Sequence, residues 1–390
     1  MKKSIKALVG IVAVAGVVAL AGCSNGGGGS NSNAITDPAA IAAGEAILPL
    51  QQPVDEFTPP GPAIANVASL KGKKVYFIPA TMQVPIFSII QGGLKASFGA
   101  AGIEVVTCDA KVNPQDLATC LGQAVDAKAG AVIVGSLPYD LAPNAFDAVT
   151  AAKIPIVMGL FGQALPKWSP AFSDASKVAY VTPNFFQMAS MNAMAVIHDS
   201  NAQAHVLVVV AKDTPATEAW MTGGAVPTYA KACPKCKVTT IETTTNELDK
   251  LPSLISAKLV ADESINYIQS DFDSLTQKIQ EGIKSAGRDN IKIVSMDAYL
   301  DVLQGMKANG QVIADFGYNL FASSWYMTDQ AFRLMTGGKA IENEQFPFQR
   351  MFTPDNVGTL DLTAKGQESG LWYGKADYMG GFAKLWGLAG

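Results

Sequence analysis

The chain has 390 residues, of which 29 are Lys or Arg and 33 are Asp or Glu, so its formal net charge is −4. The lack of a basic excess disfavours nucleic acid as a partner, and a total of three arginines leaves few forked donors for phosphate or carboxylate ligands. At about 150 residues per domain, the length predicts two lobes once the first ~65 residues are set aside.

The first 22 residues are predicted to be an export signal. Lysines precede a run of apolar residues and glycine over 7–21, which is the order typical of secretory signals. The run is shorter than the about 20 apolar residues of a membrane-spanning helix, so we expect its removal. Its end, "LAGC" at 20–23, resembles the lipobox of bacterial lipoproteins. This resemblance implies cleavage before Cys23, a diacylglycerol on its sulfur, and a location on the outer face of the cell membrane.

Residues 23–69 are predicted to form a flexible tether and a stalk. Residues 24–33 are Ser, Asn and Gly, a composition that is too polar and too free in its backbone to pack. Residues 34–69 contain many prolines and show little periodicity. We therefore expect an extended stalk with one short helix near Asp37 to Ala46.

From Lys71 onward, short apolar runs alternate with longer amphipathic ones, which is the pattern of strands and helices around a parallel sheet. Gly102 is expected to end the first of these helices. Asn113 and Pro114 suit the N-cap and the first position of the next helix. The predicted strands of this half are "KVYFIPA", "IEVVTCD", "AGAVIVGS", "KIPIVMGL" and "KVAYVTP".

After Pro183 the same alternation starts again. Two half-chains with one rhythm predict two similar α/β lobes, each a Rossmann-like parallel sheet with helices on both faces. The predicted strands of the second half are "AHVLVVVAKD", "KVTTIETT", "INYIQSD", "IKIVSMD" and "QVIADFGYN". The helices between them are expected near 186–199, 217–232, 251–261, 274–286 and 300–308.

Four cysteines remain once Cys23 is set aside, an even number in a compartment that permits disulfides. Cys233 and Cys236 have the CxxC spacing of redox and zinc sites, but no second CxxC or histidine pair accompanies them. A structural disulfide is therefore favoured there. Cys108 and Cys120 would then pair or stay as buried thiols, and three connectivities are open.

The carboxyl ends of the predicted strands are the expected ligand site, because that edge of a parallel sheet gathers helix N-termini and unpaired backbone groups. Aromatic faces beside hydrogen-bonding side chains suit a neutral polyol there, with no metal or cofactor. In the first lobe these ends hold Gln83, Phe87, Asp109, Ser136, Tyr139, Asp140, Gly159, Phe161 and Gln163. In the second lobe they hold Lys212, Asp213, Asn246, Asp271, Asp297, Tyr318 and Asn319.

Each of these residues has a structural alternative. An aspartate at a strand end is often the N-cap of the next helix, and Asp271 suits that role. Phe87 and Tyr139 suit the core of a lobe equally well. An extracellular enzyme is weakly supported, because the sequence contains no GxSxG, no HExxH and no P-loop.

Residues 70–355 resemble the type I periplasmic binding proteins, specifically the ribose-binding and LacI-like sugar-binding group that feeds ABC importers. The resemblance is strongest in "IQSDFDSLTQKIQEGIKSAGRDNIKIVSMDAYLDVLQGMKANGQVIADFGYN", where Asp271 and Asp297 match acidic positions that line the cleft. The turn at 83–87 resembles one that stacks a sugar ring, with Phe87 as its second aromatic. Trp220 stands near a position where the family usually has an arginine.

The resemblance implies a hinge of three chain crossings, near Thr182, Phe316 and Gln349. The expected lobes are then 70–181 with 318–348, and 184–315 with 350–388. It also implies a monomer without enzymatic activity that binds a sugar or polyol between the lobes and delivers it to an ABC permease in the membrane. The open alternatives are a nucleoside or hydrophobic ring compound as ligand, and a sensory role. The tail from Asp361 exceeds the usual end of the family and remains unassigned.

Overall fold

The computed structural model describes residues 34–161, 167–213, 215–245, 247–342 and 346–388. The predicted export signal, Cys23 and the tether lie outside these residues. Within them, none of the helices combines the length and the apolar character that crossing a membrane requires.

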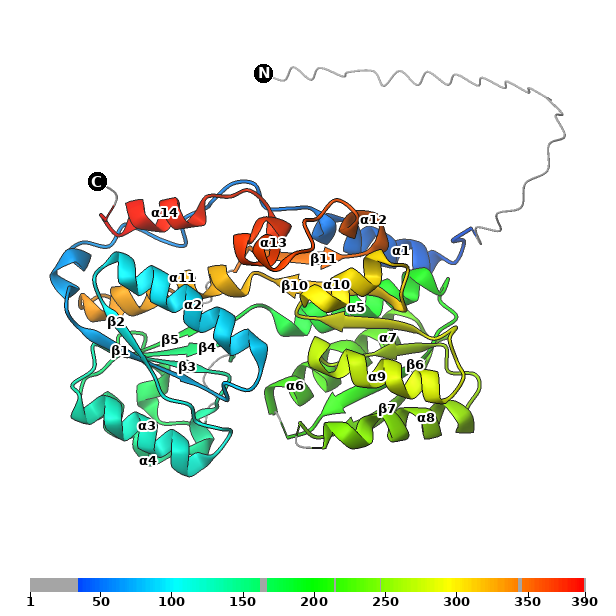
Figure 1. The fold of residues 1–390 in the computed structure, drawn as a ribbon, viewed down its shortest axis with the longest axis horizontal. Coiled ribbons are helices and arrows are strands. Elements are labelled where there is room, and N and C mark those ends of the chain that lie inside the picture. The colour runs from blue at the N-terminus through cyan, green and yellow to red at the C-terminus, as the bar shows by residue number, and fades with distance from the viewer. Residues whose placement is uncertain (1–33, 162–166, 214, 246, 343–345, 389–390) are drawn as a thin grey trace, which may run out of the picture. The chain divides into compact units, whose positions relative to one another are not determined.

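The first lobe is built on a parallel sheet of five strands (Figure 1). Its central strands are apolar and buried, as expected for a sheet that is covered on both faces. In sheet order the strands are β2 (Glu104–Thr107), β1 (Lys74–Pro79), β3 (Ala131–Gly135), β4 (Ile156–Gly159) and β5 (Val178–Val181). The connecting helices are α2 (Pro85–Ala100), α3 (Pro114–Asp126) and α4 (Pro143–Ala151).

Local signals set these helix ends as predicted. Asn113 caps α3 by accepting from the amides of Gln115 and Asp116, and Pro114 takes the first helical position. Gly102 follows α2 with a φ of 69°, a conformation that glycine adopts without strain.

The second lobe has a six-stranded sheet, which is parallel except for its last strand. In sheet order the strands are β11 (Gln349–Phe352), β10 (Val312–Tyr318), β9 (Lys292–Met296), β8 (Tyr267–Gln269), β6 (His205–Ala211) and β7 (Lys237–Thr243). The helices are α5 (Phe185–Asp199), α6 (Pro215–Trp220), α7 (Val226–Ala232), α8 (Leu251–Ala261), α9 (Asp273–Ser285) and α10 (Leu300–Lys307). A π-helical turn, Met221–Ala225, joins α6 to α7. The antiparallel edge strand β11 is not among the predicted strands.

The chain passes from one lobe to the other at several points. The first crossing joins β5 to α5 over 182–184, and the second follows β10 at Asn319. The helix after it, α11 (Leu320–Met335), packs on α2 and on strands β3 to β5 of the first lobe. The chain then returns to the second lobe at β11. The predicted fold class, two α/β lobes with mostly parallel sheets, is confirmed.

The predicted stalk is instead packed against both lobes. The expected short helix is α1 (Pro38–Ile47), which is capped by Asp37 and lies on α5 of the second lobe. Further along, the amide of Ile64 donates to the carbonyl of Leu385 at 2.8 Å, and Arg333 donates to the carbonyl of Pro62 at 3.0 Å, both in the first lobe. Apolar residues scattered among the prolines cause this packing, and the buried ones are Ala40, Ala43, Ile47, Ile64, Val67 and Leu70.

The tail is also divided between the lobes, whereas residues 350–388 were expected in the second. Its elements are α12 (Pro354–Val357), α13 (Ala364–Ser369), the short helix Leu371–Tyr373 and α14 (Tyr378–Leu385). Helix α12 lies on α10, but α14 lies on α11. Trp386 donates to Asp329 at 2.8 Å and stacks on Trp325 with ring centroids 5.4 Å apart. These contacts place 378–388 in the first lobe.

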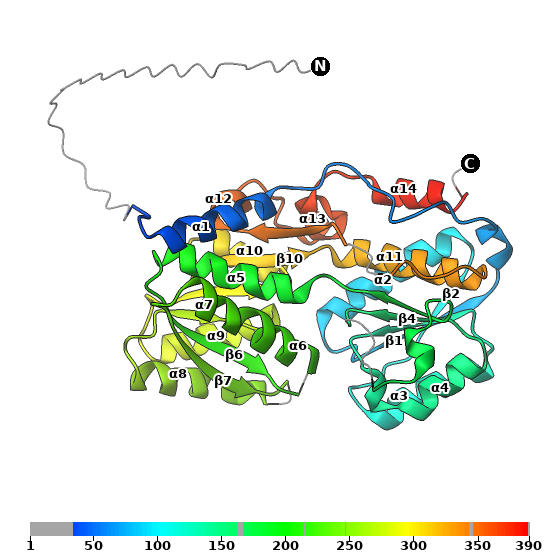
Figure 2. The same cartoon turned by 180° about the vertical axis from the view of Figure 1, so that it is seen from behind.

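Two segments, 52–63 and 374–377, thus add two further crossings, and we call them the hinge straps. They run along the same edge of the described structure (Figure 1), and Figure 2 shows them from the other side. The straps bond to each other, because Ala376 donates to the carbonyl of Val54 at 3.3 Å. The amide of Val54 donates to the carbonyl of Tyr373, the residue just before the second strap, at 2.7 Å. A Cβ on Gly374 would lie 1.9 Å from the Val54 carbonyl oxygen, so only glycine fits there.

The structure contains two disulfides, the favoured Cys233–Cys236 and also Cys108–Cys120, whose pairing the sequence leaves open. Cys108–Cys120 joins the end of β2 to α3, with Cα atoms 5.7 Å apart. Cys233–Cys236 closes the loop between α7 and β7, with Cα atoms 5.3 Å apart. Lys235 inside this loop forms an ion pair with Asp37, the cap of α1, at 2.8 Å.

Candidate functional site

At the carboxyl edge of the second sheet, Asp271 connects three elements. It follows β8 and is fully buried. Its Oδ1 accepts from Nε1 of Trp220 on α6 at 2.9 Å, and its Oδ2 accepts from the amide of Ala211 at the end of β6 at 3.0 Å. Burial raises the pKa of Asp271 to about 7, although the bonds from Ala211, Trp220 and Thr217 oppose the rise. Asp271 therefore fixes the orientation of the Trp220 ring through this hydrogen bond.

Trp220 belongs to a group of three aromatic rings, which come from separate elements and pack against one another. Phe185, the first residue of α5, stacks on Trp220 with centroids 4.4 Å apart and planes at 28°. It meets Tyr318 at the end of β10 edge to face, at 5.5 Å and 84°. Phe185 is absent from the predicted site residues, although its position directly after the first crossing is the signal that would have found it.

Asp297 follows β9 beside this aromatic group. Its side chain hydrogen-bonds with Tyr318, and only 7% of the residue is exposed. Burial raises the pKa of Asp297 well above its usual value, the charges of Asp273 and Asp271 raise it further, and the bond with Tyr318 opposes the rise. Burial thus favours the protonated form of Asp297, a form that can donate one hydrogen bond and accept others.

The backbone at Asp297 is in an unusual conformation. Asp297 has a φ of 110° and Ala298 a φ of 56°, both in the region that favours glycine. Such strain in a non-glycine pair persists only where the surroundings hold it, and it is concentrated at functional sites. The loop from Asp297 to Tyr299 is therefore part of the candidate site.

The first lobe contributes fewer of the predicted residues. Gln83 is exposed just before α2, and Ser136 is half-buried after β3 with a φ of 60°. Phe87 is buried in the lobe, where a Cβ on Gly135 would lie 3.1 Å from its ring and Phe77 is adjacent. We keep Gln83 and Ser136 as candidates at this edge and assign Phe87 to the core.

Two predicted residues of the first lobe have partners within that lobe. The hydroxyl of Tyr139 donates to Asp147 on α4 at 3.0 Å, and its ring lies 4.6 Å from that of Phe172. Asp140 forms a surface ion pair with Lys167 at 2.6 Å. We therefore remove Tyr139 and Asp140 from the candidate site.

Other predicted strand-end aspartates also stabilise loops. Both carboxyl oxygens of Asp213 accept from the amide of Thr245, at 3.0 and 2.9 Å, which joins the loops after β6 and β7. Asp109 accepts from the amide of Lys111 at 3.0 Å. Asp213 is removed from the site for this reason. Gln163 and Asn246 lie outside the described residues.

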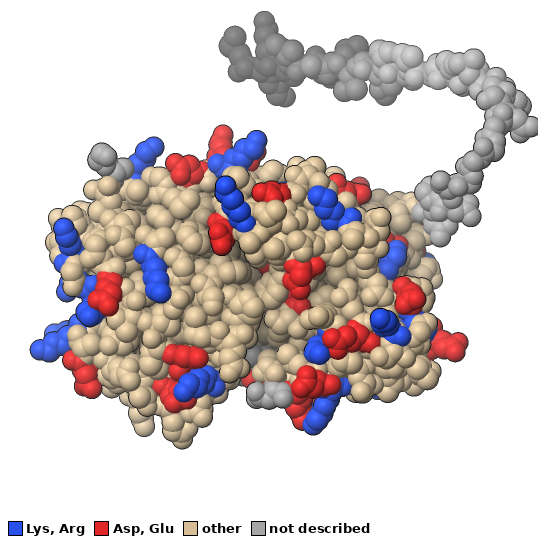
Figure 3. Space-filling view, in the orientation of Figure 1, with Lys and Arg blue, Asp and Glu red and all other residues tan. Residues whose placement is uncertain are grey.

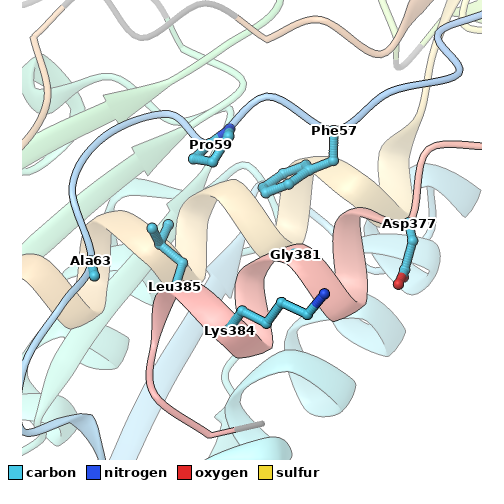
Figure 4. A pocket seen from close by; sticks show the side chains of 7 residues that line it. All are labelled: Phe57, Pro59, Ala63, Asp377, Gly381, Lys384 and Leu385. Carbon is cyan, nitrogen blue, oxygen red and sulfur yellow. The ribbon is translucent and has the colours of Figure 1, made fainter.

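The surface between the lobes is hollowed on the face that Figure 3 shows, and acidic and basic side chains are interspersed over that face. A separate open groove of about 510 Å³ lies between the first hinge strap and α14 (Figure 4). Phe57, Pro59 and Lys384 are among the residues lining it, and no predicted site residue is. In the described part of the chain, no cluster of side chains suits a metal ion.

Comparison with known proteins assigns the family. Residues 75–339 match the family model described as periplasmic binding protein domain. The chain belongs to the periplasmic binding protein family. No protein of curated function matches the sequence of this periplasmic binding protein.

Solved structures share the type I periplasmic binding protein fold with this chain. One is a carbohydrate transporter from Acidothermus cellulolyticus in complex with myo-inositol, with 20% identity, a TM-score of 0.62, and 76% of this chain and 99% of that chain covered. An ABC transporter solute binding protein from Bacillus halodurans with bound myo-inositol has 15% identity, a TM-score of 0.64, and coverages of 77% and 99%. An ABC transporter solute binding protein from Agrobacterium vitis, bound with alpha-D-tagatopyranose, has 17% identity and a TM-score of 0.64, with 74% of this chain and 96% of that chain covered. At these identities the likeness establishes the fold of this periplasmic binding protein.

Proposed function

We propose that this periplasmic binding protein is the solute-binding subunit of an ABC importer and that it binds a neutral sugar or polyol between its lobes. The observation that carries the proposal is the group formed by Trp220, Phe185 and Tyr318 beside the buried carboxyl of Asp297. Aromatic faces pack against the C–H face of a sugar ring, while a carboxylic acid bonds to its hydroxyls. Neighbours of the same fold hold myo-inositol and tagatopyranose, which supports this ligand class.

The positions of the arginines argue against an anionic ligand. Arg333 binds Asp329 and the carbonyl of Pro62, and Arg350 binds the carbonyls of Gln51 and Trp372. Arg288 donates to carbonyls at the end of α8 and in the loop before β8. All three arginines of the chain therefore have structural partners, and a charged carboxylate or phosphate would lack its usual forked partner.

The mechanism we propose is closure of the two lobes around the solute. The ligand raises the population of the closed form only by its preference for that form. The closed form then docks on the permease, while a lipid on Cys23 keeps the protein at the outer face of the membrane. The protein performs no chemistry on its ligand in this proposal.

Thermal-shift assays followed by calorimetry test the proposal. The panel holds myo-inositol, D-tagatose and D-allose as neutral polyols, nucleosides as ring compounds, and glucuronate as an anionic control. We expect at least one neutral polyol to raise the melting temperature, and to raise it less in Asp297→Ala. The absence of a shift with every member, or a shift with glucuronate alone, would contradict the proposal.

A further inference from the structure

Two buried carboxyl groups lie behind Asp297. Asp273 is the first residue of α9 and is 3% exposed, and Asp315 lies within β10 and is fully buried. Oδ2 of Asp273 accepts from the amide of Tyr299 at 2.7 Å. Oδ1 of Asp315 accepts from the amide of Ala298 at 3.1 Å. The two carboxyls thus bind successive amides directly after Asp297.

These bonds hold the loop whose backbone is strained. With φ values of 110° at Asp297 and 56° at Ala298, the loop leaves the favoured regions for non-glycine residues, which costs free energy at both positions. Bonds from buried carboxyls to both following amides offset that cost and fix the direction in which the Asp297 side chain leaves the backbone.

The other two oxygens of the pair are also buried. Asp273 Oδ1 and Asp315 Oδ2 have no hydrogen-bond partner among the described residues, although the two carboxyls bind adjacent amides and interact electrostatically with each other, and Asp273 also interacts with Ser295. Carboxylates are acceptors only, so a hydrogen bond between these two oxygens requires a proton on one of them. Burial raises the pKa of both groups, to about 7 for Asp315 and well above the usual value for Asp273, which the charge of Asp315 raises further.

We propose that Asp273 and Asp315 share a proton and together position Asp297 for ligand binding. They are positioning residues, since they act through the loop from Asp297 to Tyr299 and do not contact the solute. This inference rests on the proposed function in its binding step, whereas the sharing of the proton does not depend on the ligand.

The groups that face the pair favour retention of the proton. They come from the loop after β9, α10 and the tail: Asp297, Tyr299, Asp301 and Tyr373. The hydroxyl of Tyr373 lies against Gly317. The cation on this side, Arg350, bonds to the carbonyls of Gln51 and Trp372. Loss of the shared proton would add a negative charge among acidic neighbours.

Asparagine substitutions separate a shared proton from a simple packing role. In Asp273→Asn, the amide oxygen still accepts from Tyr299 and the NH₂ group donates to Asp315 in place of the proton. Asp315→Asn provides the mirror arrangement toward Asp273. The double variant places two NH₂ donors against each other, and neither has an acceptor.

The experiment measures unfolding by urea and affinity for myo-inositol by calorimetry, at pH 8. Each single Asn variant is expected to retain most of the wild-type stability and affinity. Asp273→Ala and the double Asn variant are expected to lose affinity by at least about tenfold, which corresponds to 1.4 kcal/mol. Asp329→Asn removes a comparable buried carboxyl from the other lobe, so it should lower stability and leave the affinity unchanged.

The possible outcomes separate the two proposals. The shared proton would be overturned if the single Asn variants lost as much stability and affinity as the double variant. It would also be overturned if the double variant equalled wild type in both. A double variant that loses stability but keeps its affinity would overturn the positioning role. If wild type binds neither myo-inositol nor any other panel member, the proposed function fails, while the non-additivity of the unfolding free energies still decides whether the proton is shared.

Discussion

The indole nitrogen of Trp220 donates a 2.9 Å hydrogen bond to the buried carboxyl of Asp271. This single contact connects α6 to the end of β8 and fixes the plane of a ring that stacks on Phe185. An aspartate at a strand end thus holds an aromatic ring of the candidate site in place and is itself shielded from solvent.

Trp220→Phe should lower both stability and ligand affinity. The phenyl ring can still stack on Phe185, but Asp271 Oδ1 loses its donor in a buried position, which costs about 1–3 kcal/mol. Urea unfolding and calorimetry with the best panel ligand measure the two effects. Trp386→Phe is the matched control, because its indole donates to Asp329 at 2.8 Å in the other lobe. Equal losses of affinity in both variants would contradict the assignment.

The free energy of unfolding should fall as the pH rises from about 4 to 7. Asp271 and Asp315 have pKa values near 7 in the folded protein against a usual value of 3.8. Between these pH values the folded state keeps protons that the unfolded chain has released. The contribution of the two groups to stability is therefore fully present below about pH 4 and is lost progressively as the pH rises to about 7. Each group contributes a slope of up to about 1.4 kcal/mol per pH unit. Urea titrations across this range measure the slope, which Asp271→Asn should reduce; a flat or rising profile would be inconsistent with the burial.

Asp297→Ala should weaken ligand binding by about 1–3 kcal/mol, the range for loss of a buried hydrogen bond. Asp297→Asn is the conservative partner, because asparagine tolerates a positive φ and keeps one donor and one acceptor. Calorimetry at pH 7 should rank the affinities as wild type, then Asn, then Ala. Wild-type affinity in the alanine variant would remove Asp297 from the site.

Phe87→Ala should affect stability more than binding. The ring is buried against Gly135 and Phe77, and truncation of a buried phenylalanine costs about 3–5 kcal/mol. Thermal and urea unfolding measure this loss. Gln83→Ala, an exposed change in the turn before the same helix, should leave stability within about 0.5 kcal/mol. A stable Phe87→Ala protein with weakened binding would return Phe87 to the ligand site.

Removal of Cys108–Cys120 by double serine substitution should cost about 3 kcal/mol, as expected for a closed loop of this order. Removal of Cys233–Cys236, whose partners are three residues apart, should cost less by the same entropy argument. Unfolding of the two double variants, with wild type under reducing conditions as a reference, compares the losses. The reverse order would mean that local packing outweighs chain entropy.

Most parallel strands of the two lobes are predictable because they are short apolar runs buried on both faces, whereas the edge strands β2 and β7 are partly exposed. Strand β11 is not predictable, because its four residues "QRMF" carry no such pattern and its pairing depends on β10. The hinge straps escape prediction for a related reason. The partly buried apolar residues of the first strap, Val54 and Phe57, lie among prolines. Asp55 in the same strap accepts from the amide of Lys375, 320 residues away in the chain.

Position at a strand end is readable from sequence, but the partner of a side chain is not. The same pattern marks Asp297 and Asp213, yet Asp213 is occupied by Thr245 from a neighbouring loop. Trp220, Asp271, Asp297 and Tyr318 do come together as a group. The role of Asp315 could not be predicted, because this residue lies inside β10 and its partner, Asp273, belongs to α9.

The hinge straps attach the two ends of the described chain to different lobes: α1 lies on the second and α14 on the first. A donor dye near residue 35 and an acceptor dye near residue 388 would therefore move relative to each other when the lobes close. The molecule has a natural layout for a fluorescent reporter of its solute, with both labels far from Trp220 and Asp297 along the chain.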